Sequence, residues 1–292
     1  MDPLEDSTNG SKGRLFVVGT PIGNLEDITL RAIRILKEVD LIACEDTRRT
    51  QKLLNHYQIR TPTISYHEHN EMTRAPELVI KLEEGNNIAL VTDAGMPVVS
   101  DPGFRLVHLA VRHNIPVVPV PGASAFVAAL AASGMPVDKF RFLGFLPGKK
   151  TARRKALEEQ KPATKTLVFY EAPHRLFEML RDVRDILGDR EVVLAREVTK
   201  VHEEFWRGTV SGLLERAKGR TIKGEITLLV GMASAPGETP PVDLLIKPEV
   251  EKLMAERGLG ERAALKAAAK ARGISRSEAY RLLQTEKTKQ TL

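Results

Sequence analysis

Ile88-Ala-Leu-Val-Thr-Asp-Ala-Gly-Met-Pro-Val-Val-Ser-Asp-Pro-Gly103 indicates the fold class of this chain. Its first four residues form a short apolar run, which is typical of a buried parallel strand. Turn-forming residues then crowd together as far as Gly103, and apolar residues with helical spacing resume at Phe104. This order predicts an open α/β sheet, in which ligands bind beyond the carboxyl ends of the strands. Gly95 would let a ligand approach the backbone, and Asp93 offers a carboxylate, although an ordinary turn with a capping aspartate fits the same residues.

The same order of strand, loop and helix recurs through the first half of the chain. Strands are expected to begin at Leu15, Leu41, Thr63, Ile88 and Ile115. Loops rich in glycine, proline and small residues follow three of them, at Gly19–Gly23, Asp93–Gly103 and Pro121–Ala125. Because right-handed crossovers align parallel strands, these three loops are expected at one edge of the sheet. The first loop has neither the dinucleotide pattern G-x-G-x-x-G nor the P-loop pattern G-x-x-x-x-G-K-[ST], which disfavours both classes of site.

The second half is expected to form a mixed sheet, because some of its strands follow one another without a helix between them. Pro147 and Gly148 end a strand-like run and mark a domain boundary. The predicted fold class is therefore α/β, with a parallel sheet, then a mixed sheet, then a small C-terminal helical domain. The predicted parts are a disordered N-terminus (1–13), two α/β domains (14–147 and 148–233), a linker (234–247) and a basic helix-turn-helix-like domain (248–292).

Length and composition narrow the class of protein. The 292 residues are 42% hydrophobic and 28% charged, which is ordinary for a globular chain long enough to bury two cores. No apolar run approaches the roughly 20 residues that span a bilayer. The acidic, polar first thirteen residues cannot be a secretory signal. The single cysteine, Cys44, excludes a disulfide framework. These features predict a cytoplasmic protein.

Positive charge concentrates at the C-terminal end of the chain. The net charge is +6, and residues 248–292 hold ten lysines and arginines against six glutamates. A basic module attached to a nearly neutral body suggests a polyanionic partner such as nucleic acid. A solvated helical surface would have the same composition, so the charge by itself leaves both interpretations open.

Charged residues also gather where the early strands end. The run Glu45-Asp-Thr-Arg-Arg49 follows the second strand and opens a helix, with Thr47 as the expected N-cap. A surface ion-pair cluster explains these residues equally well. His67 and His69 have the chemistry of metal ligands, but no third ligand of matching character is near them. We therefore predict no metal site.

Several short motifs follow one another in a fixed order between residues 14 and 232. They are V-G-T-P-I-G-N-L-E-D-I at 18–28, E-D-T-R-R at 45–49, T-D-A-G-M-P at 92–97 with S-D-P-G at 100–103, P-G-A-S at 121–124, F-L-G-F-L-P at 142–147, Y-E-A-P-H-R at 170–175, R-E-V-T-K at 196–200 and G-E at 224–225. With them the chain resembles the tetrapyrrole methylase superfamily and, within it, the bacterial ribosomal RNA small subunit methyltransferase I family. The basic tail is similar to the helix-turn-helix appendage of that family.

The resemblance implies two α/β domains of the tetrapyrrole-methylase, or class III methyltransferase, type. It implies S-adenosylmethionine bound between them as methyl donor, in a homodimer. The acceptor that it implies is the ribose 2′-hydroxyl of one cytidine in the decoding region of 16S ribosomal RNA, within the small subunit. The cofactor loops of the superfamily match positions that include Pro21, Asp93, Ala94, Gly95, Ser100 and Ser124.

Methyl transfer from a sulfonium is an in-line displacement. Holding the oxygen, the methyl carbon and the sulfur in line can lower the activation barrier by on the order of 7 kcal/mol or more. A ribose hydroxyl is a weak acid, so a base or a nearby cation should help it to lose its proton. The residues expected to face the target ribose are Glu45, Asp46, Glu171 and Lys223. Each of them could equally be a structural ion pair or a cap.

Phosphate contacts to the RNA require a basic path, because such contacts position the RNA without reading its sequence. The tail is expected to supply it together with Lys149, Lys150, Arg153 and Arg154. Two other functions stay open at this point. One is another methylase of the superfamily, acting on a tetrapyrrole carbon or on a protein, and the other is a non-enzymatic regulator that binds nucleic acid through its tail.

Overall fold

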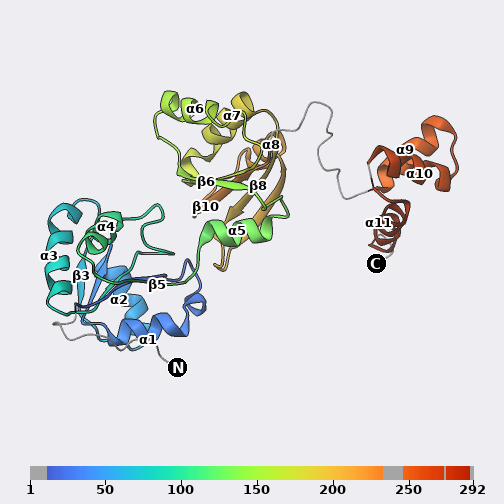
Figure 1. Cartoon of the computed structure of the whole chain (residues 1–292). Coiled ribbons are helices and arrows are strands. Elements are labelled where there is room, and N and C mark those ends of the chain that lie inside the picture. Colours follow the sequence, from blue (N-terminus) through green and yellow to red (C-terminus); the bar gives the residue numbers. More distant parts are fainter. Residues whose placement is uncertain (1–11, 233–245, 273, 290–292) are drawn as a thin grey trace. The chain divides into compact units, whose positions relative to one another are not determined.

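The computed structural model describes residues 12–232, 246–272 and 274–289 (Figure 1). It divides into two compact units, residues 1–233 and 234–292. The predicted disordered N-terminus and the predicted linker lie almost entirely outside the described residues. Of the helices in the described part of the chain, none is long and apolar enough to cross a membrane.

The first sheet is fully parallel, as the repeated strand–loop–helix order predicts. Its strand order is β3-β2-β4-β1-β5. The strands are β1 (Leu15–Val18), β2 (Leu41–Cys44), β3 (Thr63–Ser65), β4 (Ile88–Leu90) and β5 (Val117–Val120). In this order β1 lies between β4 and β5, so the loops after these three strands are neighbours at one edge. The prediction that the three loops meet there is confirmed.

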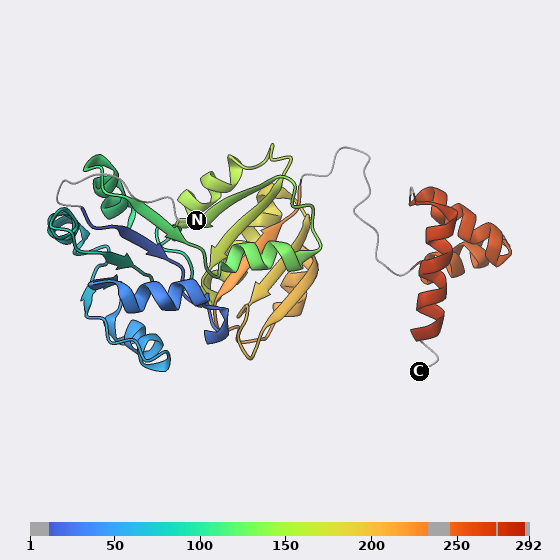
Figure 2. The ribbon, with the colours of Figure 1, turned by 60° about the horizontal axis from the view of Figure 1, so that its bottom comes forward.

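Helices cover both faces of the first sheet (Figures 1 and 2). They are α1 (Leu30–Glu38), α2 (Thr47–His56), α3 (Glu71–Glu83) and α4 (Phe104–Arg112), with a short 3-10 helix η1 (Leu25–Asp27) before α1. Side chains alternate along the strands, so Phe16 packs with α1 and α2 while Leu15 packs with α3 and α4. The N-cap of α2 is Asp46, whose side chain accepts a hydrogen bond from the Arg48 N–H. The prediction of Thr47 as N-cap is wrong, because the helix starts one residue earlier and Thr47 is its first residue.

The second sheet is mixed, which confirms the prediction for this half. Its order is β6-β7-β10-β8-β9, in which only the β6–β7 pair is parallel. The strands are β6 (Phe140–Phe145), β7 (Thr166–Glu171), β8 (Glu191–Arg196), β9 (Glu204–Thr209) and β10 (Ile226–Val230). One face packs against α6 (Lys150–Glu158), α7 (Leu176–Leu187) and α8 (Val210–Ala217). A 3-10 helix η2 (Pro173–Arg175) leads into α7.

The change from one sheet to the other falls earlier in the chain than the predicted boundary at Pro147. Strand β6 pairs with β7, and α5 (Ala125–Ser133) packs through Ala129 and Leu130 against the other face of the second sheet. Both elements therefore belong with the second sheet, so the change lies between β5 and α5. Pro147 and Gly148 end β6, which gives the local turn signal without a change of sheet.

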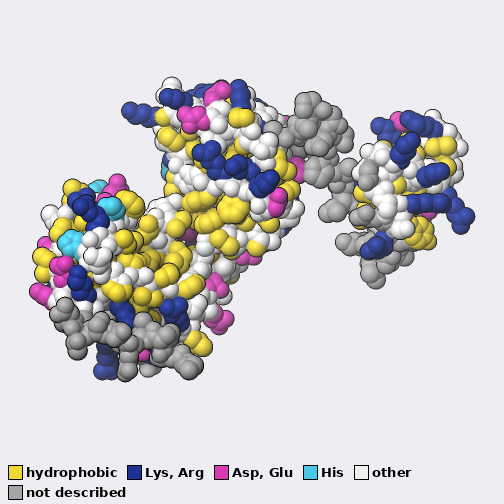
Figure 3. Space-filling view, in the orientation of Figure 1, with side chains coloured by type: hydrophobic (Ala, Val, Ile, Leu, Met, Phe, Trp, Pro, Cys, Tyr) yellow, Lys and Arg dark blue, Asp and Glu magenta, His cyan; other side chains and the backbone are white. Residues whose placement is uncertain are grey.

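The second unit consists of α9 (Lys247–Arg257), α10 (Glu261–Ala271) and α11 (Arg276–Lys289). These helices enclose a small apolar cluster of their own, which includes Val250, Leu265, Ala268 and Leu283. Many lysine and arginine side chains lie on the surface of this unit (Figure 3). The predicted small C-terminal helical domain is thereby confirmed.

Candidate functional site

The loops after β1 and β4 are tied together by backbone pairing. The Thr20 N–H donates to the Gly95 carbonyl over 2.9 Å, and the Gly95 N–H donates back to the Thr20 carbonyl over 3.1 Å. The Thr20 hydroxyl, which is buried, donates to the Thr92 carbonyl at 3.0 Å. These bonds make one rigid rim from two loops whose bonded residues are 72 and 75 positions apart in the sequence.

The loop after β5 meets the same rim at two glycines. A Cβ placed on Gly122 would lie 2.7 Å from the Gly19 Cα, and a Cβ on Gly19 would lie 2.7 Å from the Gly122 Cα. Real Cβ atoms do not approach backbone atoms this closely, so both positions require glycine. The two backbones thus touch directly, and the three loops form a single surface.

The central loop after β4 holds unusual backbone conformations. Val98 and Ser100 have φ angles of 76° and 67°, which are uncommon for residues other than glycine and most unfavourable for a β-branched side chain. Such conformations persist only where surrounding contacts over-determine them, and they cluster at ligand sites. The strain marks this loop as part of a site.

A cavity of about 420 Å³ opens beside these loops. Its lining comes from both sheets: Ile22, Glu45, Arg49, Asp93, Ala94, Gly95, Met96, Val99, Ser100, Asp101, Ser124, Ala125, Phe145, Tyr170, Glu171, Ala172, Pro173, Val198, Gly224, Glu225, Ile226 and Thr227. A volume of this size accommodates a small organic ligand. The lining includes five of the six predicted cofactor residues, namely Asp93, Ala94, Gly95, Ser100 and Ser124. Pro21 is buried and does not line the cavity, whereas its neighbour Ile22 does.

The four predicted catalytic residues separate into two pairs. Glu45 and Glu171 line the cavity. Asp46 does not, because its carboxylate caps α2 and pairs with Arg48 at 2.8 Å. Lys223 does not either, since it lies just before the cavity residues Gly224 and Glu225 and lines a second, separate groove.

Negative charge surrounds the cavity. Asp93 accepts hydrogen bonds from the Asp46 N–H at 3.1 Å and pairs with Arg49 at 3.2 Å, so it joins the β2 and β4 loops. For Asp101, burial and the charges of Glu45, Asp93 and Glu225 outweigh a hydrogen bond with Thr92 and raise its pKa to about 6. The five carboxylates that line this cavity favour a ligand that carries positive charge.

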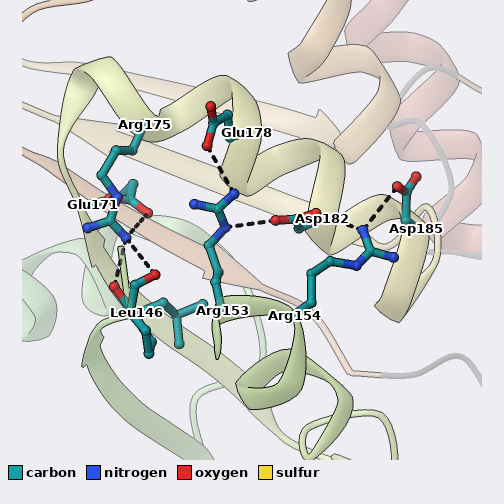
Figure 4. A network of polar contacts seen from close by, with 9 residues as sticks. Leu146, Arg153, Arg154, Glu171, Arg175, Glu178, Asp182 and Asp185 are labelled. Atoms are coloured by element: carbon teal, nitrogen blue, oxygen red, sulfur yellow. Dashed lines mark hydrogen bonds and ion pairs between the residues drawn. The ribbon is translucent and has the colours of Figure 1, made fainter. Parts of the chain in front are cut away.

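Glu171 is held in place by a basic neighbour. Its side chain is closed to solvent, pairs with the Arg175 Nε at 3.2 Å and accepts the Ala172 N–H at 2.8 Å. Burial raises the pKa of Glu171, against the lowering effect of these two donors. Arg175 also donates to the Leu146 carbonyl at 2.7 Å, which links the end of β7 to the chain after β6 (Figure 4).

Two of the predicted phosphate contacts are engaged within the protein. Arg153 is 1% exposed and donates to Asp182 at 2.7 Å and to Glu178 at 3.1 Å (Figure 4). Arg154 donates to the other oxygen of Asp182 at 2.7 Å. The prediction of Arg153 as an RNA contact is wrong, because acids of α7 draw its guanidinium into the protein. Arg154 is partly exposed and shares its charge with the same acid.

Sequence reasoning missed several cavity residues, including Asp101, Tyr170, Glu225 and Thr227. The first three lie inside motifs quoted above, so position within a motif was the available signal. Thr227 lies on β10, and only the pairing of β10 with β7 brings it to the cavity. Arg49 lines the cavity and pairs with Asp93, whereas the neighbouring Arg48 points to Asp46.

Comparison with known proteins gives consistent matches. The family described as tetrapyrrole (corrin/porphyrin) methylases matches residues 14–214. A protein of Halalkalibacterium halodurans named ribosomal RNA small subunit methyltransferase I is 50% identical over 278 residues, covering 94% of this chain and 96% of that protein. A protein of the same name from Thermotoga maritima is 51% identical over 218 residues, covering 75% of this chain and 98% of that protein.

Solved structures of low sequence identity share the fold. Uroporphyrin-III C-methyltransferase from Thermus thermophilus, complexed with S-adenosyl homocysteine, has a TM-score of 0.54 at 20% identity. The match covers 74% of this chain and 97% of that one. Its extent agrees with two α/β sheets followed by an additional C-terminal unit.

Proposed function

Because the chain belongs to the tetrapyrrole methylase family, and within it to the ribosomal RNA small subunit methyltransferase I proteins, we propose that it methylates a cytidine ribose in 16S ribosomal RNA. The protein is a methyltransferase with S-adenosylmethionine as methyl donor. The assignment of ribosomal RNA as the substrate is supported by the 50% identity to a relative of that name along 94% of the chain. The target is the 2′-hydroxyl of one cytidine in the decoding region of the small subunit.

Transfer of labelled methyl groups tests this function directly. Purified protein should label small ribosomal subunits that lack the modification, at the 2′-hydroxyl of a cytidine, and should leave uroporphyrinogen unlabelled. Label on the tetrapyrrole would instead favour the other methylases of the superfamily. A preference for duplex DNA over ribosomal RNA, without any transfer, would favour a regulator.

The donor occupies the cavity in this proposal. The loops holding Asp93–Gly95, Ser100 and Ser124 bind it, with the sulfonium facing the carboxylates of Glu45 and Asp101. Glu45 is the residue placed to accept the proton of the ribose hydroxyl as the methyl group passes from sulfur to oxygen. Glu171 is a positioning residue in this proposal. Its side chain is closed to solvent, and it holds the cavity residues Ala172 and Pro173 in place through its bonds to Arg175 and to the Ala172 N–H.

The positive charge of the donor gives a pH dependence that its demethylated product lacks. As the pH rises from 5 to 8, Asp101 ionises through its pKa of about 6 and adds negative charge to the cavity. We expect the affinity for S-adenosylmethionine, relative to that for S-adenosylhomocysteine, to rise by up to about fivefold, since a partly solvated ion pair is worth up to about 1 kcal/mol. Titration calorimetry with both ligands at the two pH values measures this ratio.

The comparison cancels groups that the two ligands share, because both carry the same amino-acid and adenine parts. The variant Asp101→Asn should make the ratio nearly independent of pH. The unliganded protein should lose stability as the pH rises through 6, since the folded-state pKa of Asp101 lies above its ordinary value of 3.8. A ratio in the unmodified protein that stays constant from pH 5 to 8 contradicts this assignment.

The C-terminal unit serves RNA binding in this proposal and not the chemistry. The Thermotoga maritima relative, which has the same name, leaves about a quarter of this chain unmatched, about the size of the N-terminal tail plus the C-terminal unit. Removing Pro248–Leu292 should therefore weaken RNA binding and reduce its salt dependence, because ten cations are lost. Cofactor affinity should stay the same. If the truncated protein keeps the RNA affinity of the full chain across a salt series, the C-terminal unit does not contribute to RNA binding.

A homodimer is the proposed assembly, and the cytoplasm is the proposed location because ribosomal RNA is methylated there. Two apolar side chains of α4 support an interface: Phe104 is 70% exposed and Val111 is 60% exposed. Hydrophobic side chains gather on the face of the first unit seen in Figure 3. Sedimentation of the full chain distinguishes one copy from two.

A further inference from the structure

One row of residues runs across the second sheet from the cavity to a basic groove. Register places Ile226 of β10 opposite Glu171 of β7 on one side and opposite Arg196 of β8 on the other. Arg196 in turn pairs with Glu204 of β9. Directly opposed residues share a face of a sheet. Because neighbouring strands lie about 4.8 Å apart, Arg196 lies roughly 10 Å from Glu171 along this row.

The basic groove lies at the far end of the row, with a volume of about 510 Å³. Its lining comes from the β8–β9 hairpin and from the chain between α8 and β10: Arg196, His202, Glu204, Trp206, Arg220, Thr221, Ile222 and Lys223. Lys223 is followed by Gly224 and Glu225, which line the cavity. The groove and the cavity therefore share one edge of the sheet.

The groove has more positive charge than its own acid can compensate. Glu204 accepts the Arg196 guanidinium at 2.6 Å, so these two charges offset each other. The Arg216 and Arg220 guanidinium carbons lie 4.4 and 5.7 Å from the centre of the Trp206 ring. In the described part of the chain, no carboxylate lies within 4.0 Å of Arg216, Arg220 or Lys223.

Trp206 cannot serve as a stacking platform for bases, since only 3% of it is exposed. Its ring instead contacts the guanidinium of Arg220, which lines the groove. Arg220 and Lys223 are themselves exposed to solvent. Exposed cations with no carboxylate partner within 4.0 Å suit a phosphate backbone better than they suit a neutral ligand.

We propose that the basic groove binds the RNA phosphates beside the target nucleotide, through Arg220 and Lys223. The inference rests on the proposed ribosomal RNA substrate. The distance of roughly 10 Å between Glu171 and Arg196 is short enough for one RNA segment of a few nucleotides to reach both the cavity and the groove. This contact assigns a role to Lys223 other than the catalytic one expected from the sequence, and it replaces the contact that the buried Arg153 cannot make.

The test is the double variant Arg220→Ala with Lys223→Ala, measured by fluorescence anisotropy on a labelled decoding-region RNA over a salt series. The slope of log affinity against log salt should become shallower by about 1.4, since each phosphate contact to single-stranded RNA contributes about 0.7. Affinity at low salt should fall about tenfold or more. The affinity for S-adenosylhomocysteine should remain that of the unmodified protein and so confirm the fold of the cavity.

A matched control removes one arginine and one lysine elsewhere. The double variant Arg31→Ala with Lys37→Ala makes the same change of charge at two exposed positions of α1, which packs on the first sheet. It should leave the slope of log affinity against log salt unchanged. If the control variant loses as much slope and affinity, or if the Arg220 and Lys223 variant keeps the slope of the unmodified protein, the groove does not bind the RNA phosphates. Either result leaves the proposed function intact. Failure of the unmodified protein to bind ribosomal RNA would overturn both.

Discussion

Replacing Gly122 with alanine is expected to lower the affinity for S-adenosylmethionine about 100-fold. The new methyl group would lie 2.7 Å from the Gly19 Cα and 2.8 Å from its carbonyl carbon. Neither neighbour is a flexible side chain that can turn away, so the loops after β1 and β5 must separate. A cost of about 3 kcal/mol is at the upper end for overpacking and corresponds to a factor of about 100 in affinity. Titration calorimetry with S-adenosylmethionine measures the loss.

The control for this prediction is Gly212→Ala in α8. A Cβ at Gly212 would meet only the Thr209 Oγ1, at an ordinary contact distance of 3.6 Å. Alanine is also the better helix former, so this variant should bind the donor normally and unfold at the same or a higher temperature. If Gly122→Ala binds the donor as tightly as Gly212→Ala does, direct contact between the two loops is not what shapes the cavity.

The variant Glu45→Gln is expected to slow methyl transfer about 100-fold or more, which is the lower end of the range for general base catalysis. Glutamine has nearly the same size, and its oxygen can still accept the Thr92 hydroxyl, which now donates to Glu45 at 3.1 Å. It cannot take a proton from the ribose hydroxyl. Single-turnover transfer at saturating donor and RNA isolates the chemical step and measures this loss.

Glu171→Gln provides the comparison that separates the two cavity glutamates. Glu171 is closed to solvent and paired with Arg175, so its replacement should lower thermal stability more than it lowers the single-turnover rate. The opposite pattern, with Glu45→Gln transferring at the normal rate and Glu171→Gln inactive, would exchange the two roles. Normal rates in both variants would mean that another group accepts the proton of the ribose hydroxyl.

Local patterns in the sequence were enough to predict the elements of this fold. Ile88–Leu90 form a buried strand and a strained loop follows it, because short apolar runs and clustered turn formers act over a few residues. The parallel order of the first sheet and the meeting of its three loops follow from the handedness of crossovers. The resemblance to the methylase superfamily identified five cavity residues, all of them in loops that directly follow the strands.

The misplaced residues are those whose position depends on a distant partner. Strand β6 carries no local sign that it pairs with β7, so the boundary was expected too late in the chain. The charge of Arg153 suggests a surface contact, but Asp182 of α7 draws the guanidinium into the protein. Lys223 lies two residues before the cavity residue Glu225, yet it lines the basic groove.

Spacing and residue type within short segments are enough to predict strands followed by helices, and small residues at their junctions that leave space for a ligand. Contacts between distant parts of the chain determine which carboxylates reach the cavity, which arginines are compensated inside the protein and which cations remain for a phosphate. Those outcomes depend on pairs such as Glu171 with Ile226 and Arg153 with Asp182, which long-range pairing and packing bring together.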